Sequence, residues 1–135
     1  MRAEGTFKVV AFDAAEVTPK IEVQTGVPVG VATMEKRFSG DVEGRSATLF
    51  TAAFDQATGV GTYVAMESFT GAVDGVEGTF AFAHSATTHG TDRTSELFVI
   101  VPTSGTGGLA GISGSGGLAV DPDGTHRVWL TYELS

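Results

Sequence analysis

Residues 60–88 read VGTYVAMESFTGAVDGVEGTFAFAHSATT, two strand-like runs on either side of a turn centred on Asp74 and Gly75. Alternate positions of each run carry aromatic rings, and the positions between them carry small or hydroxyl-bearing side chains. This period of two is typical of β-strands that bury one face. The short Asp-Gly connection then predicts an antiparallel hairpin.

The turn also predicts the register of this hairpin. If Asp74 and Gly75 are its central residues, the numbers of opposed residues sum to 149, so that Glu67 lies opposite Phe82 and Ala65 opposite His84. We expect the aromatic face to point inward, and its members are Tyr63, Ala65, Glu67, Phe69, Phe80, Phe82 and His84. A slip by one residue would separate Glu67 from His84.

The same period extends over most of the chain. Strands are predicted at residues 4–12, 30–39, 45–54, 60–70, 77–88, 95–102, 114–120 and 125–134. Their short connections are rich in Gly, Asp and Pro, which indicates antiparallel neighbours in a sandwich or a closed barrel. We predict a single all-β domain over residues 1–135, an eight-stranded antiparallel β-barrel whose first and last strands pair. Residues 13–29 would loop over one end of the barrel.

Composition excludes several classes of protein. The formal net charge of −8 repels nucleic acid and anionic membranes, so neither is expected as a partner. No run approaches the roughly 18 apolar residues that a membrane span requires. The chain has no cysteine and begins without the apolar core of a signal peptide. We therefore expect a cytoplasmic protein without disulfides.

Neither a nucleotide site nor a metal site is expected. The glycine-rich residues 102–117 cannot form a P-loop, because no lysine follows Lys36. Gly105, Gly107 and Ala110 match the dinucleotide-binding pattern only nominally, because the residues after them cannot continue as a helix. The glycines of this segment instead suit sharp turns, with Leu109 and Ile112 plugging a barrel end. His84 and His89 point to opposite faces of one strand. We predict no metal and no other cofactor.

Several of these motifs resemble the DUF3224 family of proteins of unknown function. They are FSGDVEG at residues 38–44, Glu67 with the glycines and His84 that follow it, and SGTG at residues 104–107 with Leu109, Gly111 and Gly114. The resemblance implies an eight-stranded barrel similar to allene oxide cyclase, a calycin-like fold whose wider relatives include dirigent proteins. It implies no specific activity, and no catalytic residue is transferred from it.

The inward face predicts a lumenal pocket for a small, mostly apolar molecule. Its expected lining residues are Tyr63, Phe69, Phe80, Phe82 and Tyr132, beside Glu67 and His84. Burial raises the pKa of a glutamate and a charged histidine lowers it. With the pKa lifted towards neutrality, Glu67 oriented by His84 would serve as the general acid or base of a cofactor-free isomerase or cyclase. The alternatives are that this pair only satisfies itself in a filled core, or that the protein is a non-catalytic small-molecule-binding or dirigent-like scaffold.

One further expectation concerns assembly. Trp129 is predicted on the outer face of the last strand, where it would join an apolar patch that a second copy could cover in a homodimer.

Overall fold

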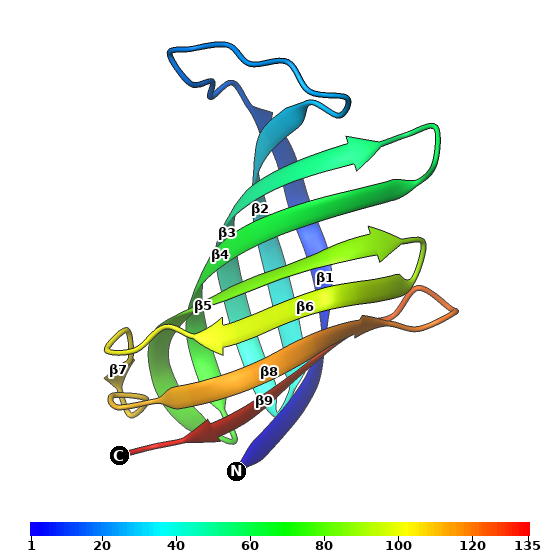
Figure 1. The fold of residues 1–135 in the computed structure, drawn as a ribbon. Helices are drawn as coiled ribbons and strands as arrows, with labels where there is room; N and C mark the ends of the chain where they lie inside the picture. The colour runs from blue at the N-terminus through cyan, green and yellow to red at the C-terminus, as the bar shows by residue number, and fades with distance from the viewer.

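The computed structural model describes residues 1–135 and consists of strands and turns without a helix (Figure 1). The strands are β1 (Arg2–Ala15), β2 (Val29–Gly40), β3 (Val42–Asp55), β4 (Val60–Val73), β5 (Val76–His89), β6 (Asp92–Ile100), β7 (Thr106–Gly107), β8 (Ser113–Val120) and β9 (His126–Glu133). None of its segments is a helix of the length and apolarity needed to cross a membrane.

Eight of these strands close into an antiparallel barrel, which confirms the predicted fold. The ring runs β4-β3-β2-β1-β9-β8-β6-β5 and returns to β4 through the β4–β5 hairpin. The first and last strands pair, with Ala3 opposite Leu130. The ninth strand, which the sequence did not predict, is the two-residue β7, and it pairs with β5 at Gly78 and Thr79.

The predicted hairpin register is also confirmed, because Glu67 lies opposite Phe82 and Ala65 opposite His84. The turn places Asp74 at φ 50° and Gly75 at φ 79°, in the left-handed region that Asp and Gly tolerate better than most residues. Since a two-residue turn leaves no slack, the inward face follows from it directly.

Glycines let neighbouring strands approach closely where the barrel bends. Gly44 of β3 and Gly71 of β4 lie opposite each other. A Cβ atom added to Gly71 would lie 2.1 Å from the carbonyl oxygen of Glu43, and its φ of +157° is unfavourable for other residues. A side chain at this position would therefore force the two strands apart.

One half of the lumen is a packed apolar core. Its members come from every strand of the ring and from the glycine-rich segment, where Leu109 and Ile112 are 0% and 2% exposed, as predicted. The cluster comprises Ala3, Phe7, Phe38, Val42, Phe69, Val73, Phe80, Phe82, Phe98, Ile100, Leu109, Ile112, Leu118, Val128, Leu130 and Tyr132. This core closes the end of the barrel at which the glycine-rich segment lies.

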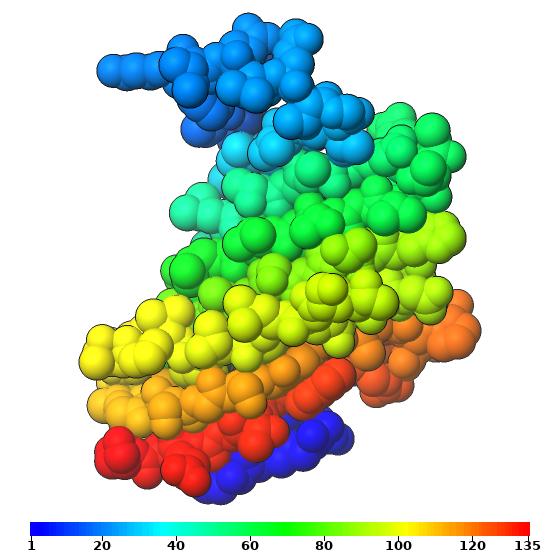
Figure 2. Space-filling view, in the orientation of Figure 1, coloured from blue at the N-terminus to red at the C-terminus, as the bar shows by residue number.

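The long connection between β1 and β2 behaves differently from the prediction. It was expected to loop over a barrel end, but it projects beyond the ends of β1 and β2 (Figures 1 and 2). Its apolar side chains stay in solvent, since Val17 is 64% exposed and Ile21 and Val23 are each 76% exposed. These side chains therefore do not pack against the barrel.

Candidate functional site

A layer of buried polar side chains crosses the middle of the lumen. Its five members are Lys36 of β2, Ser46 and Thr48 of β3, Glu67 of β4 and His84 of β5, none more than 4% exposed. Apolar core residues follow them along each strand towards one end of the barrel. Towards the other end the strands line a cavity, so this polar layer separates a filled half of the lumen from a hollow one.

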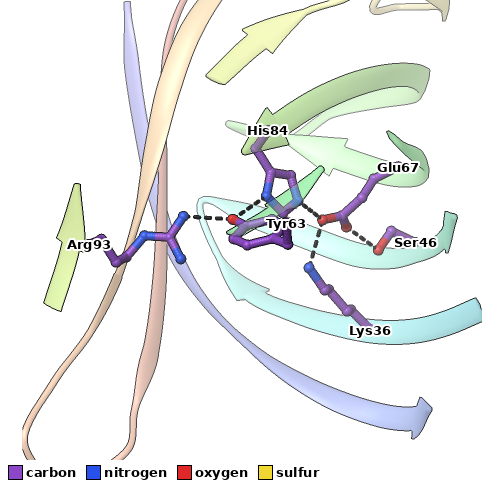
Figure 3. Close-up of polar contacts among 6 residues, drawn as sticks. All are labelled: Lys36, Ser46, Tyr63, Glu67, His84 and Arg93. Carbon is purple, nitrogen blue, oxygen red and sulfur yellow. Dashed lines mark hydrogen bonds and ion pairs between the residues drawn. The ribbon is translucent and has the colours of Figure 1, made fainter. Parts of the chain in front are cut away.

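The carboxylate of Glu67 is the centre of the polar layer (Figure 3). The Nζ atom of Lys36 donates to its Oε2 atom at 2.6 Å, and the Oγ atom of Ser46 donates to its Oε1 atom at 2.7 Å. The Nε2 atom of His84 is hydrogen-bonded to Oε2 as well. Three donors from three other strands therefore meet one carboxylate.

His84 extends this network towards the cavity through Tyr63. The Oη atom of Tyr63 lies 2.7 Å from Nδ1 of His84, and Nη2 of Arg93 donates to the same Oη atom at 2.6 Å. Because a guanidinium only donates, the phenol accepts from Arg93 and directs its own proton to Nδ1. His84 then carries its proton on Nε2 and donates it to Glu67, so the hydrogen bonds run in one direction from Arg93 to Glu67.

Burial by itself raises the pKa of Glu67, but its partners outweigh that effect. The hydrogen bond from His84 and the charge of Lys36 lower the pKa from 4.5 to about 2. The expected rise towards neutrality is therefore wrong, because the ammonium group of Lys36 was not among the partners expected from the sequence. Glu67 is a carboxylate at neutral pH and accepts from three donors already.

The histidine and the tyrosine of the network remain neutral near pH 7. Burial lowers the pKa of His84, and the charges of Lys36 and Arg93 add to this against the opposing effect of Glu67. Burial also raises the pKa of Tyr63, although its hydrogen bond with Arg93 opposes the shift. A neutral imidazole thus accepts from a protonated phenol.

The aromatic side chains predicted to line a pocket lie mostly in the core. Phe69, Phe80, Phe82 and Tyr132 are 2% or 3% exposed, and the rings of Phe69 and Phe80 are 5.2 Å apart. Tyr132 donates from its hydroxyl to Asp74 at 2.5 Å, and burial together with that carboxylate raises its pKa to about 12. These four residues therefore fill the lumen on the core side of the polar layer.

The largest cavity lies on the opposite side of the polar layer and measures about 500 Å³. Among the residues of the predicted pocket, Tyr63 alone lines it. Its ring stacks on Phe50 with centroids 5.4 Å apart, and Phe50 in turn meets the edge of Phe12. The lining residues are Phe12, Ala14, Gly30, Val31, Ala32, Phe50, Ala52, Phe54, Gln56, Gly61, Thr62, Tyr63 and Thr88.

Three residues of the network, Lys36, Ser46 and Arg93, were not predicted from the sequence. Lys36 could have been recognised, because it is an even number of residues from Ala32 and Phe38 and so lies on the same, apolar face of a predicted strand. Ser46 had no comparable signal, since serine is common on either face. Arg93 lies outside the strand predicted at 95–102, whereas β6 begins at Asp92.

The other two histidines and Trp129 do not join the network. His89 is exposed, and His126 is half-buried beside Phe7 with ring centroids 4.9 Å apart. The structure contains no cluster of three His, Asp or Glu side chains that could hold a metal ion. Trp129 is half-buried, with the guanidinium of Arg2 5.6 Å from its ring centre. The homodimer stays a prediction.

Comparison with known proteins agrees with the fold and the motifs. The family model described as "Protein of unknown function (DUF3224)" matches residues 3–132. The chain belongs to the DUF3224 family. A crystal structure of a DUF3224 protein with unknown function from Shewanella oneidensis MR-1 is similar over 100% of this chain and 98% of its own, with 26% sequence identity and a TM-score of 0.83. No curated protein matches the sequence.

Proposed function

We propose that this DUF3224 protein binds a small, largely apolar molecule in the cavity above the polar layer. The observation that carries the proposal is a cavity of about 500 Å³ with mostly apolar walls and a single networked phenol, Tyr63. Ligand sites typically measure roughly 300–1,000 Å³ and combine apolar walls with a few oriented polar groups.

The exposure of the cavity walls supports binding. Phe12 and Phe54 are 58% and 51% exposed although both line the cavity. Transfer of a large aromatic side chain out of water is favourable by about 25 cal/mol for each Å² of apolar surface buried. A ligand in the cavity would bury part of both rings, so part of its affinity would come from the protein's own apolar surface.

The polar contact is set by the hydrogen bonds of Tyr63. Its oxygen accepts from Arg93 and its proton points to His84, so one lone pair stays available to a ligand. A hydroxyl group of a ligand would donate to that lone pair. The polar layer thereby fixes the direction of the only aromatic hydroxyl group at the cavity.

Binding of the neutral fluorescent probe N-phenyl-1-naphthylamine tests this proposal. Ala52→Trp fills the cavity and is expected to weaken probe binding tenfold or more. Thr51→Trp is the matched control, because Thr51 is the exposed neighbour of Ala52 on β3, and it should leave the affinity unchanged. Absence of saturable binding, or equal binding by both variants, would contradict a ligand site in this cavity.

A second candidate, a cofactor-free isomerase or cyclase, is favoured by the chain from Tyr63 through His84 to Glu67. In this mechanism Tyr63 exchanges a proton with the substrate and His84 receives or supplies it, while the Glu67 carboxylate stabilises the imidazolium. The pair predicted from the sequence would then act through Tyr63, since neither Glu67 nor His84 lines the cavity.

Proton exchange into a bound ketone distinguishes catalysis from binding alone. With 2-decanone in D₂O, the enzyme hypothesis predicts deuterium incorporation next to the carbonyl, followed by NMR. Tyr63→Phe should lower that rate by roughly 10²–10⁴-fold while probe binding persists. Binding without exchange would instead favour the non-catalytic or dirigent-like alternative.

A further inference from the structure

The charges that face the lumen differ in sign from those of the whole chain. The protein carries a formal net charge of −8, yet Lys36 and Arg93 are its only two basic residues that are not exposed, and both point inward (Figure 3). The carboxylate of Glu67 balances the positive charge of Lys36 within the lumen. The carboxylate that pairs with Arg93 is Glu96, whose side chain is 46% exposed and therefore screened by water.

Of these two cations, Arg93 retains binding capacity. The Nζ atom of Lys36 donates to Glu67 and lies 4.7 Å from the ring centre of Phe7, so its surroundings are occupied. Arg93 uses Nε for Glu96 and one N–H of Nη2 for Tyr63. A guanidinium has five N–H donors, so three of them lack a protein acceptor. The Arg93 side chain is nevertheless only 14% exposed.

Arg93 does not line the cavity itself, but its guanidinium lies next to a residue that does. Its Nη2 atom lies 2.6 Å from the hydroxyl oxygen of Tyr63, which lines the cavity. A ligand atom that touches this hydroxyl is therefore within reach of the guanidinium. Arginine forms charge-assisted, often bidentate, hydrogen bonds with carboxylates, and these are stronger than bonds between neutral groups.

The imidazoles of the lumen support a site for an anion. Burial lowers the pKa of both His84 and His126, and the positive charges of Lys36 and Arg93 lower it further. Glu67 opposes this effect at His84 only. Lys36 and Arg93 thus act as positive charges on both imidazoles, and an anion placed near them would be favoured.

We propose that the ligand of this cavity is an apolar molecule with a carboxylate at its polar end, held by the free N–H groups of Arg93. This inference rests on the proposed binding function and adds the class of ligand. The apolar body would lie against Phe12, Phe50 and Phe54, with the carboxylate at the free N–H groups of Arg93. An amine of the same length is disfavoured by Arg93 and Lys36, and an alcohol forms no charge-assisted bond.

Three probes with the same apolar chain test the charge preference, namely decanoate, 1-decanol and decylamine at pH 8. Each displaces N-phenyl-1-naphthylamine, and decanoate is expected to bind at least tenfold more tightly than the alcohol, a difference of about 1.4 kcal/mol. Arg93→Gln should remove this preference, because decanoate then loses its charge-assisted hydrogen bonds. Arg127→Gln, which removes an exposed arginine paired with Asp121, is the matched control and should preserve the preference.

A second measurement does not depend on any variant. NMR titration of the wild-type protein should show the pKa of His84 and His126 rising when decanoate binds and remaining unchanged with decanol. Equal affinity for the acid and the alcohol, with no change in either histidine, would overturn the carboxylate inference while the binding site stands. Failure of all three probes to displace the fluorophore would contradict the proposed function itself.

Discussion

Replacement of Glu67 by Gln tests the energetic role of the polar layer most directly. The amide keeps the size of the side chain but removes the negative charge that Lys36 and His84 contact. Lys36 would then be a buried ammonium without a counterion. Removal of one partner of a buried ion pair destabilises a protein by about 3–5 kcal/mol, which is the loss we expect at pH 7.

The pH dependence of this loss follows from the pKa of Glu67. The folded protein holds it at about 2 against an ordinary value of 4.5, so the carboxylate favours the folded state above about pH 4.5. This contribution, about 3 kcal/mol at 1.36 kcal/mol per pH unit, is lost as the pH falls from 4.5 towards 2. The Glu67→Gln protein lacks this contribution. The difference in free energy of unfolding between it and the wild type should therefore narrow by about 3 kcal/mol between pH 4.5 and pH 2.

Urea unfolding between pH 2 and pH 7, followed by the fluorescence of Trp129, measures both quantities. Trp129 is the sole tryptophan, so the signal has one source. Glu4→Gln is the control, because Glu4 is 64% exposed in its pair with Arg2 and its loss should cost less than about 1 kcal/mol. Two results would contradict a stabilising role of the buried ion pair. One is a Glu67→Gln protein as stable as the wild type at pH 7, and the other is a stability difference that stays constant down to pH 2.

Three further variants address packing and hydrogen bonding, each read by the same unfolding assay. Thr48→Val should raise the free energy of unfolding by about 1 kcal/mol, because the buried Oγ1 atom of Thr48 has no hydrogen-bond partner; a clear loss would show that the hydroxyl is satisfied. Ser46→Ala should lower it by about 1–3 kcal/mol, since Oε1 of Glu67 loses its donor, and an unchanged value would contradict that role. Gly71→Ala should lower the free energy of unfolding by at least about 2 kcal/mol, through backbone strain and the contact with Glu43. The control Gly26→Ala should leave it unchanged, because an added Cβ atom there meets no atom within 4 Å. Equal effects of the two variants would refute the close approach of β3 and β4.

Local patterns of the sequence were sufficient for the eight strands of the barrel and for one hairpin register. Strand periodicity depends on neighbouring residues, and the turn at Asp74 and Gly75 joins its two strands without slack. The proximity of Glu67 and His84 therefore followed from sequence, as did the inward aromatic face. The segment between β1 and β2 was placed wrongly because a connection without strong turn signals has no local rule for its path.

Only the closed barrel decided the chemistry of the site. Lys36, Ser46 and Arg93 reach Glu67 and Tyr63 from strands up to 31 residues away in the chain, and local periodicity says nothing about such contacts. The sign of the Glu67 pKa shift depends on these partners, because burial alone would have raised the pKa. The division of the lumen into a packed half and a hollow half is likewise a property of all eight strands together, since the free volume depends on how their side chains meet across the barrel.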